Sequence, residues 1–201
     1  MRVIGLTGPV ASGKNFIASR LKDLKIPVFD ADFQVHKLLS ENQQIIDKIK
    51  KHFPKAVVKS LVDRKLLGKE VFNNPQKLKI LENIIYPFLR QKEDEFLKKC
   101  LIKRKKIAVL NIPLLFEKGG FARCDANISI SAPRKIRLNR FLKRHKEGNI
   151  DEMIKKFAAI NQNQLDDFQR KKFKKHVLHS GLDKGYSVRK IKLLIKNICN
   201  V

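Results

Sequence analysis

The feature that most constrains this chain is a glycine-containing loop between its first apolar stretch and its first helical pattern. Residues 3–6 are apolar enough for a buried strand, and apolar side chains recur at helical spacing from Ile17 onwards. Between them, Gly8, Gly13 and Lys14 have the spacing Gly-x-x-x-x-Gly-Lys. Glycines allow backbone N–H groups to turn around oxyanions, while the helix N-terminus and the lysine add positive charge. The arrangement predicts a phosphate-binding loop in preference to a plain turn between a strand and a helix.

Two positions of this loop depart from the usual pattern. Asn15 follows the lysine, where phosphate-binding loops carry Ser or Thr, whose hydroxyl holds Mg²⁺. An amide oxygen is also a hard donor that suits Mg²⁺, although it sits on a longer side chain. Pro9 has no N–H to offer a phosphate. We therefore expect the loop to bind a nucleotide. Because Asn15 replaces the residue that usually holds Mg²⁺, the loop alone does not predict the rate of turnover.

The net charge of +26 has three interpretations. It is the electrostatic signature of nucleic-acid binding, it would steer polyphosphate substrates to the protein, or it is a lysine-rich composition. Basic runs such as residues 103–106 are typical of solvated surface. We favour a composition bias with a contribution from steering, because lysine excess alone is weak evidence for a nucleic-acid site.

Length and composition narrow the class of protein. A chain of 201 residues with 43% hydrophobic content can form one core domain with an insertion. No apolar run is long enough to span a membrane, and no secretion signal is visible. Three scattered cysteines argue against a disulfide framework and a zinc knuckle. We expect a cytoplasmic protein.

The second strand, residues 26–29, is followed by Asp30 and Asp32. Acidic residues at the carboxyl end of a parallel strand lie where open α/β sheets bind ligands. Alternatively, one of the two aspartates caps a helix that starts near Phe33. Residues 33–100 carry helical patterns and few strand signals, which predicts an all-helical insertion.

Three later strands complete a predicted five-stranded parallel sheet flanked by helices, an α/β fold; they are residues 107–110, 126–131 and 177–178. A helix after Pro133 carries Arg137, Arg140 and Arg144 on one face. Such a face suits a lid that closes on transferring phosphates, or else it is a solvated basic surface. A further helix is predicted from Ile150 to about Phe157, followed by an irregular Asn/Gln-rich segment.

The predicted domains are a nucleotide-binding core of residues 1–34 and 102–201, with a lid at about 133–165, and an insertion of residues 35–101. Further motifs accompany the loop: Asp30-Ala31-Asp32, Asp63-Arg64-x-x-Leu67-Gly68-x-x-Val71-Phe72, Leu81-Glu82-x-Ile84-x-x-Pro87-x-x-Arg90, Pro113-Leu114-Leu115-Phe116-Glu117 and Arg140-x-x-x-Arg144. Together these motifs resemble the dephospho-coenzyme A kinase family of P-loop nucleotide kinases.

The resemblance implies a helical domain that binds the phosphoryl acceptor, and a small lid. It also implies that ATP, with Mg²⁺, phosphorylates the 3′-hydroxyl of dephospho-CoA in the final step of CoA biosynthesis. The partners it implies are small molecules, with no specific nucleic acid and no membrane. The alternatives are a nucleotide-binding pseudokinase with turnover impaired by Asn15, a nucleic-acid binder suggested by charge alone, or a kinase for another small molecule.

The resemblance also assigns roles to residues of this chain. The catalytic residues it implies are Lys14, Asp32 (the base on the acceptor hydroxyl) and Arg140. The nucleotide-binding residues are Gly8, Ala11, Ser12, Gly13, Lys14, Asn15, Phe16 and Arg144. The acceptor-binding residues are Asp30, Arg64, Tyr86 and Arg90, and the metal ligands are Asn15 and Asp30. Tyr86 stands where the family commonly has histidine, and the lid glutamine of the family matches Gln162 or Gln164.

Overall fold

The computed structural model describes residues 1–72, 74–145, 149–166, 169–170, 172–173, 176–181 and 183–199. The chain divides into two compact units, Met1–Phe29 with Cys100–Val201, and Asp30–Lys99. The first division falls a few residues before the boundary expected from the sequence, because a helix begins directly after the second strand.

The first unit is built on one sheet. Its strands follow the order β2-β5-β1-β6-β7, and β1 is paired in parallel with both β5 and β6, as is β6 with β7. The bounds are β1 Arg2–Thr7, β2 Val28–Asp30, β5 Ile107–Asn111, β6 Ala126–Ser131 and β7 His176–His179. The predicted five-stranded α/β fold is confirmed.

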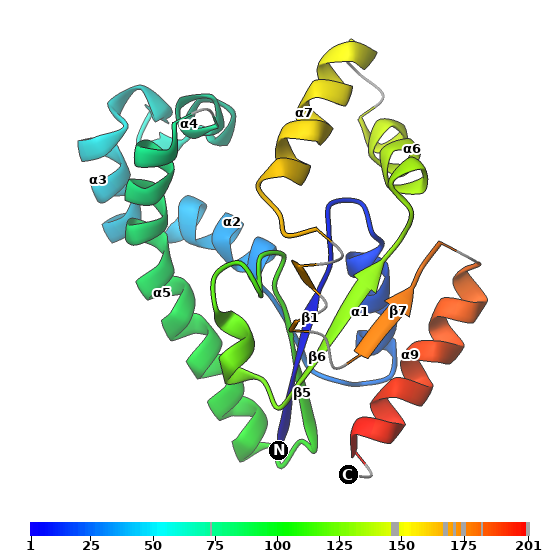
Figure 1. Cartoon of the computed structure of the whole chain (residues 1–201). Helices are drawn as coiled ribbons and strands as arrows, with labels where there is room; N and C mark the ends of the chain where they lie inside the picture. Colours follow the sequence, from blue (N-terminus) through cyan, green and yellow to red (C-terminus); the bar gives the residue numbers. More distant parts are fainter. Residues whose placement is uncertain are drawn as a thin grey trace. The chain divides into compact units, whose positions relative to one another are not determined.

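Two helices, α1 (Lys14–Asp23) and α9 (Lys184–Cys199), pack side by side against this sheet (Figure 1). Alternate strand residues such as Ile4 and Leu6 are fully buried and form one core with Ile17 of α1. Because successive strand residues face opposite sides, this alternation assigns one face of the sheet to the two helices. The loop between β1 and α1 is thereby held between two buried elements.

The region expected to form a lid contains α6 (Arg134–Arg144) and α7 (Ile150–Gln162). The helix that begins at Ile150 was predicted to end near Phe157. This prediction was wrong, since α7 continues to Gln162. The Asn/Gln-rich sequence suggested irregular structure. In fact Ile160 packs beside buried Phe157 and Phe141, and this apolar contact extends the helix.

The second unit contains α2 (Ala31–Glu41), α3 (Gln43–His52), α4 (Arg64–Val71) and most of α5 (Pro75–Ile102). Its own core gathers apolar residues from these helices, among them Ile45, Ile49, Phe53, Leu67 and Ile84.

The expectation that the insertion is entirely helical was wrong. An antiparallel pair, β3 (Val57–Val58) and β4 (Leu61–Val62), lies between α3 and α4. The connecting Lys59 and Ser60 both have positive φ, 49° and 62°. Positive φ at both positions is typical of a tight hairpin turn, in which Asn or Gly is usual. Neither Asn nor Gly occurs at these two positions, so the turn could not be recognised from the sequence.

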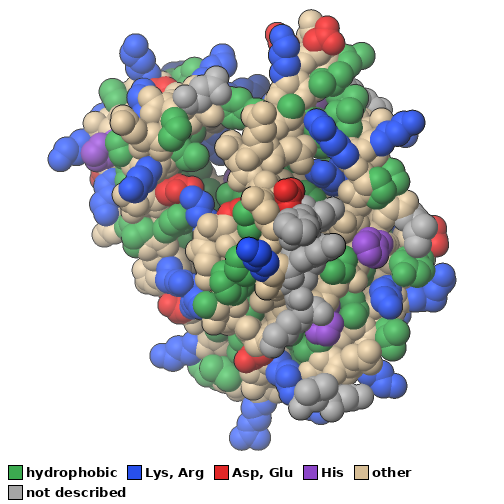
Figure 2. All heavy atoms as spheres, viewed as in Figure 1, with side chains coloured by type: hydrophobic (Ala, Val, Ile, Leu, Met, Phe, Trp, Pro, Cys, Tyr) green, Lys and Arg blue, Asp and Glu red, His purple; other side chains and the backbone are tan. Residues whose placement is uncertain are grey.

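Lys and Arg side chains are dispersed over the visible surface and do not gather in one patch (Figure 2). This distribution agrees with a basic composition bias. Among the described residues, no helix is long and apolar enough to cross a membrane.

Candidate active site

The loop between β1 and α1 has the backbone that close wrapping requires. An added Cβ at Gly8 would lie 2.6 Å from the carbonyl oxygen of Ile130 in β6, so only glycine fits there. Gly13 precedes the first residue of α1 and has a φ of 94°, which favours glycine. The helix thus begins at Lys14, with its N-terminal N–H groups at the loop.

Lys14 is almost entirely buried, with 8% of its surface exposed. Its Nζ donates a hydrogen bond to Oδ1 of Asn111, the last residue of β5, at 2.8 Å. A strand end beside the loop therefore holds the ammonium group in place. Asn111 was not among the predicted site residues, although a polar residue at the carboxyl end of a core strand lies where open α/β sheets bind ligands.

Asn15 is exposed in the first turn of α1. No cluster of three or more His, Cys, Asp or Glu side chains that could hold a metal ion occurs in the described part of the chain. The Asn15 amide oxygen is a hard donor of the kind that Mg²⁺ prefers.

The remaining loop residues predicted to bind the nucleotide are arranged in different ways. Ser12 is buried, and its hydroxyl makes no hydrogen bond with the described residues, so one polar group remains available to a ligand. The Phe16 ring lies beneath the guanidinium of Arg20 at 5.5 Å and near the ammonium of Lys184 at 6.0 Å. Phe16 can therefore serve a nucleotide through its backbone while its ring packs against these cations.

Arg140 of α6 lies beside the phosphate loop. Its Nη1 donates to the Ser12 carbonyl at 3.3 Å and to Ser180 Oγ at 3.2 Å, and its Nη2 donates to the Ser180 carbonyl at 2.6 Å. Ser180, just after β7, also donates its hydroxyl to the Ser12 carbonyl. Arg144 is exposed in the last turn of α6, and no hydrogen bond or ion pair joins it to the loop, all of whose residues are described. The loop therefore has one arginine of the predicted pair beside it.

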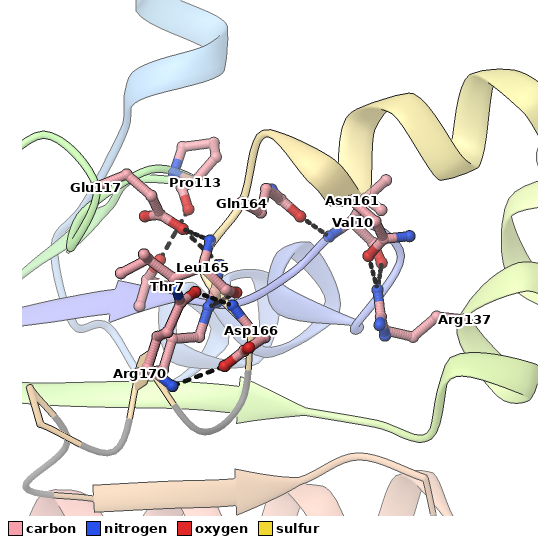
Figure 3. A network of polar contacts seen from close by, with 11 residues as sticks. Thr7, Val10, Pro113, Glu117, Arg137, Asn161, Gln164, Leu165, Asp166 and Arg170 are labelled. Atoms are coloured by element: carbon pink, nitrogen blue, oxygen red, sulfur yellow. Dashed lines mark hydrogen bonds and ion pairs between the residues drawn. The ribbon is translucent and has the colours of Figure 1, made fainter.

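A buried ion pair fixes the segment that follows α7 (Figure 3). Arg170 is fully buried, and its Nη2 lies 2.8 Å from Oε1 of Glu117, whose side chain is 10% exposed. The same Glu117 oxygen accepts the N–H of Leu165 at 3.0 Å, while Arg170 Nε donates to the Leu165 carbonyl at 2.8 Å. The backbone of Leu165 is thus held at its N–H by Glu117, which lies on the loop after β5, and at its carbonyl by Arg170. Glu117 belongs to a motif noted in the sequence, but its partner Arg170 could not be identified there.

Replacing Arg170 with methionine is expected to lower the free energy of unfolding by about 3 kcal/mol, because the buried Glu117 carboxylate loses its charged partner. Urea denaturation followed by circular dichroism measures the change. The double variant Arg170→Met/Glu117→Leu removes both charges and is expected to recover at least half of the loss. Equal instability of the single and double variants would contradict the role of the ion pair.

The aspartates that follow β2 take different positions. Asp30 ends β2 and caps α2, since its Oδ1 accepts the backbone N–H of Phe33 at 3.1 Å. Asp32 is exposed in the first turn of α2. The capping alternative considered for one of the pair therefore holds for Asp30. The helix itself begins at Ala31, two residues before the start near Phe33 that the sequence suggested.

Arg64 begins α4 in the second unit, directly after its cap Asp63. Its Nη1 lies 2.7 Å from Nδ1 of His36 on α2. Arginine can only donate, so Nδ1 is the acceptor in this contact. His36 was not predicted, and the structure adds it to the surroundings of Arg64.

Tyr86 and Arg90 lie one turn apart on α5. Tyr86 donates its hydroxyl to Oε1 of Glu82 at 3.1 Å, and burial together with the Glu82 charge raises the pKa of the phenol far above its usual value. Arg90 lies 3.5 Å from the buried carboxylate of Glu93, and burial raises the pKa of that carboxyl although Arg90 opposes the shift. Because its pKa is raised, the Tyr86 hydroxyl stays protonated at physiological pH and can donate a hydrogen bond.

Comparison with known proteins links the loop to a family. A family model described as dephospho-CoA kinase matches residues 2–183. A dephospho-CoA kinase from Bartonella quintana is 37% identical over 198 residues, which are 98% of this chain and 98% of that protein. Another, from Gluconobacter oxydans, is 34% identical over 198 residues with the same coverage of both proteins.

Solved structures agree with the fold. A crystal structure of a Thermus thermophilus protein has a TM-score of 0.83 at 29% identity and covers 98% of this chain and 97% of its own. Dephospho-CoA kinase from Campylobacter jejuni has a TM-score of 0.60 at 24% identity, with 98% and 97% covered.

Proposed function

The chain belongs to the dephospho-CoA kinase family, and from that premise we propose that it transfers the γ-phosphoryl group of ATP to the 3′-hydroxyl of dephospho-CoA, giving CoA. The observation that carries the proposal is the extent of the family match. Residues 2–183 include the phosphate loop and every residue placed on the acceptor side. The resemblance first inferred from scattered motifs is confirmed at the level of the family.

Phosphoryl transfer needs alignment and neutralisation of charge more than covalent chemistry. We assign the neutralisation to Lys14, held by Asn111, and to Arg140, which lies beside the loop. Asp32 is the proposed base that accepts the proton of the acceptor hydroxyl. Arg64, Tyr86 and Arg90 are the proposed acceptor contacts, while Gly8, Ala11, Gly13 and Phe16 contribute to the backbone of the nucleotide site.

Mg²⁺ would be held by the Asn15 amide oxygen together with nucleotide phosphates, and when bound it would neutralise charge on the transferring group. Asp30 remains a proposed second contact to the metal. We also propose a cytoplasmic location, since three scattered cysteines suit a reducing compartment. Arg144 is proposed to join the nucleotide from the end of α6.

Purified protein incubated with ATP, Mg²⁺ and dephospho-CoA tests the function. We expect ADP and a product whose new phosphomonoester is assigned to the 3′ position by ³¹P nuclear magnetic resonance. Dephospho-CoA with a 3′-deoxyribose is the control, because it offers no hydroxyl at that position. ATP consumption without a phosphorylated product, or equal reaction of the deoxy compound, would refute the assignment.

The second candidate function is a nucleotide-binding pseudokinase, and the observation that favours it is Asn15. If the Asn15 amide serves the metal, Asn15→Ser is expected to change kcat by less than about threefold and to leave the Mg²⁺ dependence of ATP binding similar. A gain above about tenfold would instead identify an impaired native loop. Steady-state kinetics over a Mg²⁺ series, with calorimetric titration of ATP, separates the two outcomes.

A further inference from the structure

The backbone of Val10, inside the phosphate loop, is held at both its N–H and its carbonyl by residues distant in sequence (Figure 3). Its N–H donates to Oε1 of Gln164 at 2.9 Å. Its carbonyl accepts from Nη1 of Arg137 at 3.4 Å, and the same Nη1 donates to Asn161 Oδ1 at 2.7 Å. Side chains from α6 and from the end of the α7 region therefore hold the two peptide groups on either side of the Val10 Cα.

The residue after Val10 explains why such support is needed. Ala11 has a φ of 59°, a left-handed conformation that a residue with a Cβ adopts only under constraint. Its methyl group packs with Phe141 of α6 and Phe157 of α7. The loop thus takes its shape partly from the two lid helices, through an apolar contact at Ala11 and polar contacts at Val10.

Gln164 can support the loop because its own position is fixed. The adjacent Leu165 donates its N–H to Glu117 and accepts from Arg170 through its carbonyl. These two partners form the buried ion pair described above. Gln164 is consequently anchored at its backbone and presents its amide oxygen to the loop.

We propose that Gln164 is a positioning residue of the nucleotide site, which holds the Val10 N–H so that the loop is already shaped for phosphates before ATP arrives. The inference rests on the proposed function only in taking this loop as the ATP site. A loop held in its binding conformation pays less conformational entropy when the ligand binds. The role is therefore in nucleotide affinity, and the acceptor and the chemical step are not involved.

The test compares Gln164→Met, which removes the acceptor oxygen at similar length, with Gln44→Met, the same substitution at an exposed glutamine of α3 that has no assigned role. Calorimetric titration is expected to give a Kd for ATP about fivefold higher in Gln164→Met and unchanged in the control, the size expected of one neutral hydrogen bond. The KM for ATP rises by the same factor, while kcat and the KM for dephospho-CoA stay within about twofold.

Hydrogen exchange gives a second readout that needs no activity. The Val10 amide is expected to exchange about tenfold faster in Gln164→Met and at the wild-type rate in Gln44→Met. Should Gln164→Met not fold, Gln164→Asn withdraws the oxygen by one methylene and has the same expected results.

Unchanged ATP affinity in the Gln164 variant, or equal weakening in both glutamine variants, would overturn the proposal. The proposed function is tested separately from the role of Gln164. A wild-type protein that binds ATP but does not phosphorylate dephospho-CoA would refute the function, and the ATP titration would still decide the role of Gln164.

Discussion

Replacing Lys14 with methionine is expected to lower kcat/KM for ATP by about 10³-fold, because it removes the buried positive charge that the phosphate loop holds for the transferring group. Methionine has a similar unbranched length and suits a site that is 8% exposed. The fold is expected to survive, since the charged hydrogen bond from Nζ to Asn111 is worth about 1.5–3 kcal/mol, less than a typical free energy of unfolding. Steady-state kinetics and thermal unfolding of the same preparation measure both effects.

Lys22→Met is the matched control, because Lys22 is an exposed lysine in the last turn of the same helix. It removes an equal charge from this basic chain without touching the loop. If Lys22→Met lowered kcat/KM as much as Lys14→Met, the effect would come from the overall field of the protein and the assignment to the loop would fail.

The sheet and its phosphate loop could be predicted because their signals are local. Strand β6 spans Ala126–Ser131, the residues expected from their apolar alternation, and the glycine spacing identified the turn before α1. The helical insertion was visible for the same reason, since its apolar residues recur with the helical period. The hairpin at Lys59 and Ser60 was missed because neither residue is Asn, Asp or Gly, the types that usually mark a hairpin turn with positive φ.

The contacts that complete the site could not be predicted, since a hydrogen bond between distant residues leaves no periodicity in the sequence. Lys14 and Asn111 are 97 positions apart, and Val10 and Gln164 are 154 positions apart. The arginine face of α6 was predicted either as part of a lid or as a solvated basic surface. The contact of its Arg140 with the Ser12 carbonyl of the phosphate loop depends on tertiary packing. Sequence therefore located the phosphate loop, while tertiary packing decided the partner of each side chain.

Asp32→Asn is expected to lower kcat by about 10³-fold, the size of effect associated with loss of a positioned general base. The division of labour between the two aspartates motivates the choice. Asp30 is engaged as the cap of α2 through the Phe33 N–H, whereas Asp32 is exposed in the first turn of that helix. Asparagine keeps the shape of the side chain and cannot accept the hydroxyl proton. The ATP affinity is expected to stay within about twofold, because the base acts on the acceptor.

A loss of charge near the start of α2 also weakens a favourable interaction with the helix dipole, by about 0.5 kcal/mol. Thermal unfolding of Asp32→Asn measures this loss of stability. Asp47→Asn, at an exposed position of α3, is the control variant with the same change of charge. If Asp32→Asn retained kcat within about threefold, Asp32 would not be the base. A large fall in kcat with an intact fold and normal ATP binding would support the assignment of the proton transfer to Asp32.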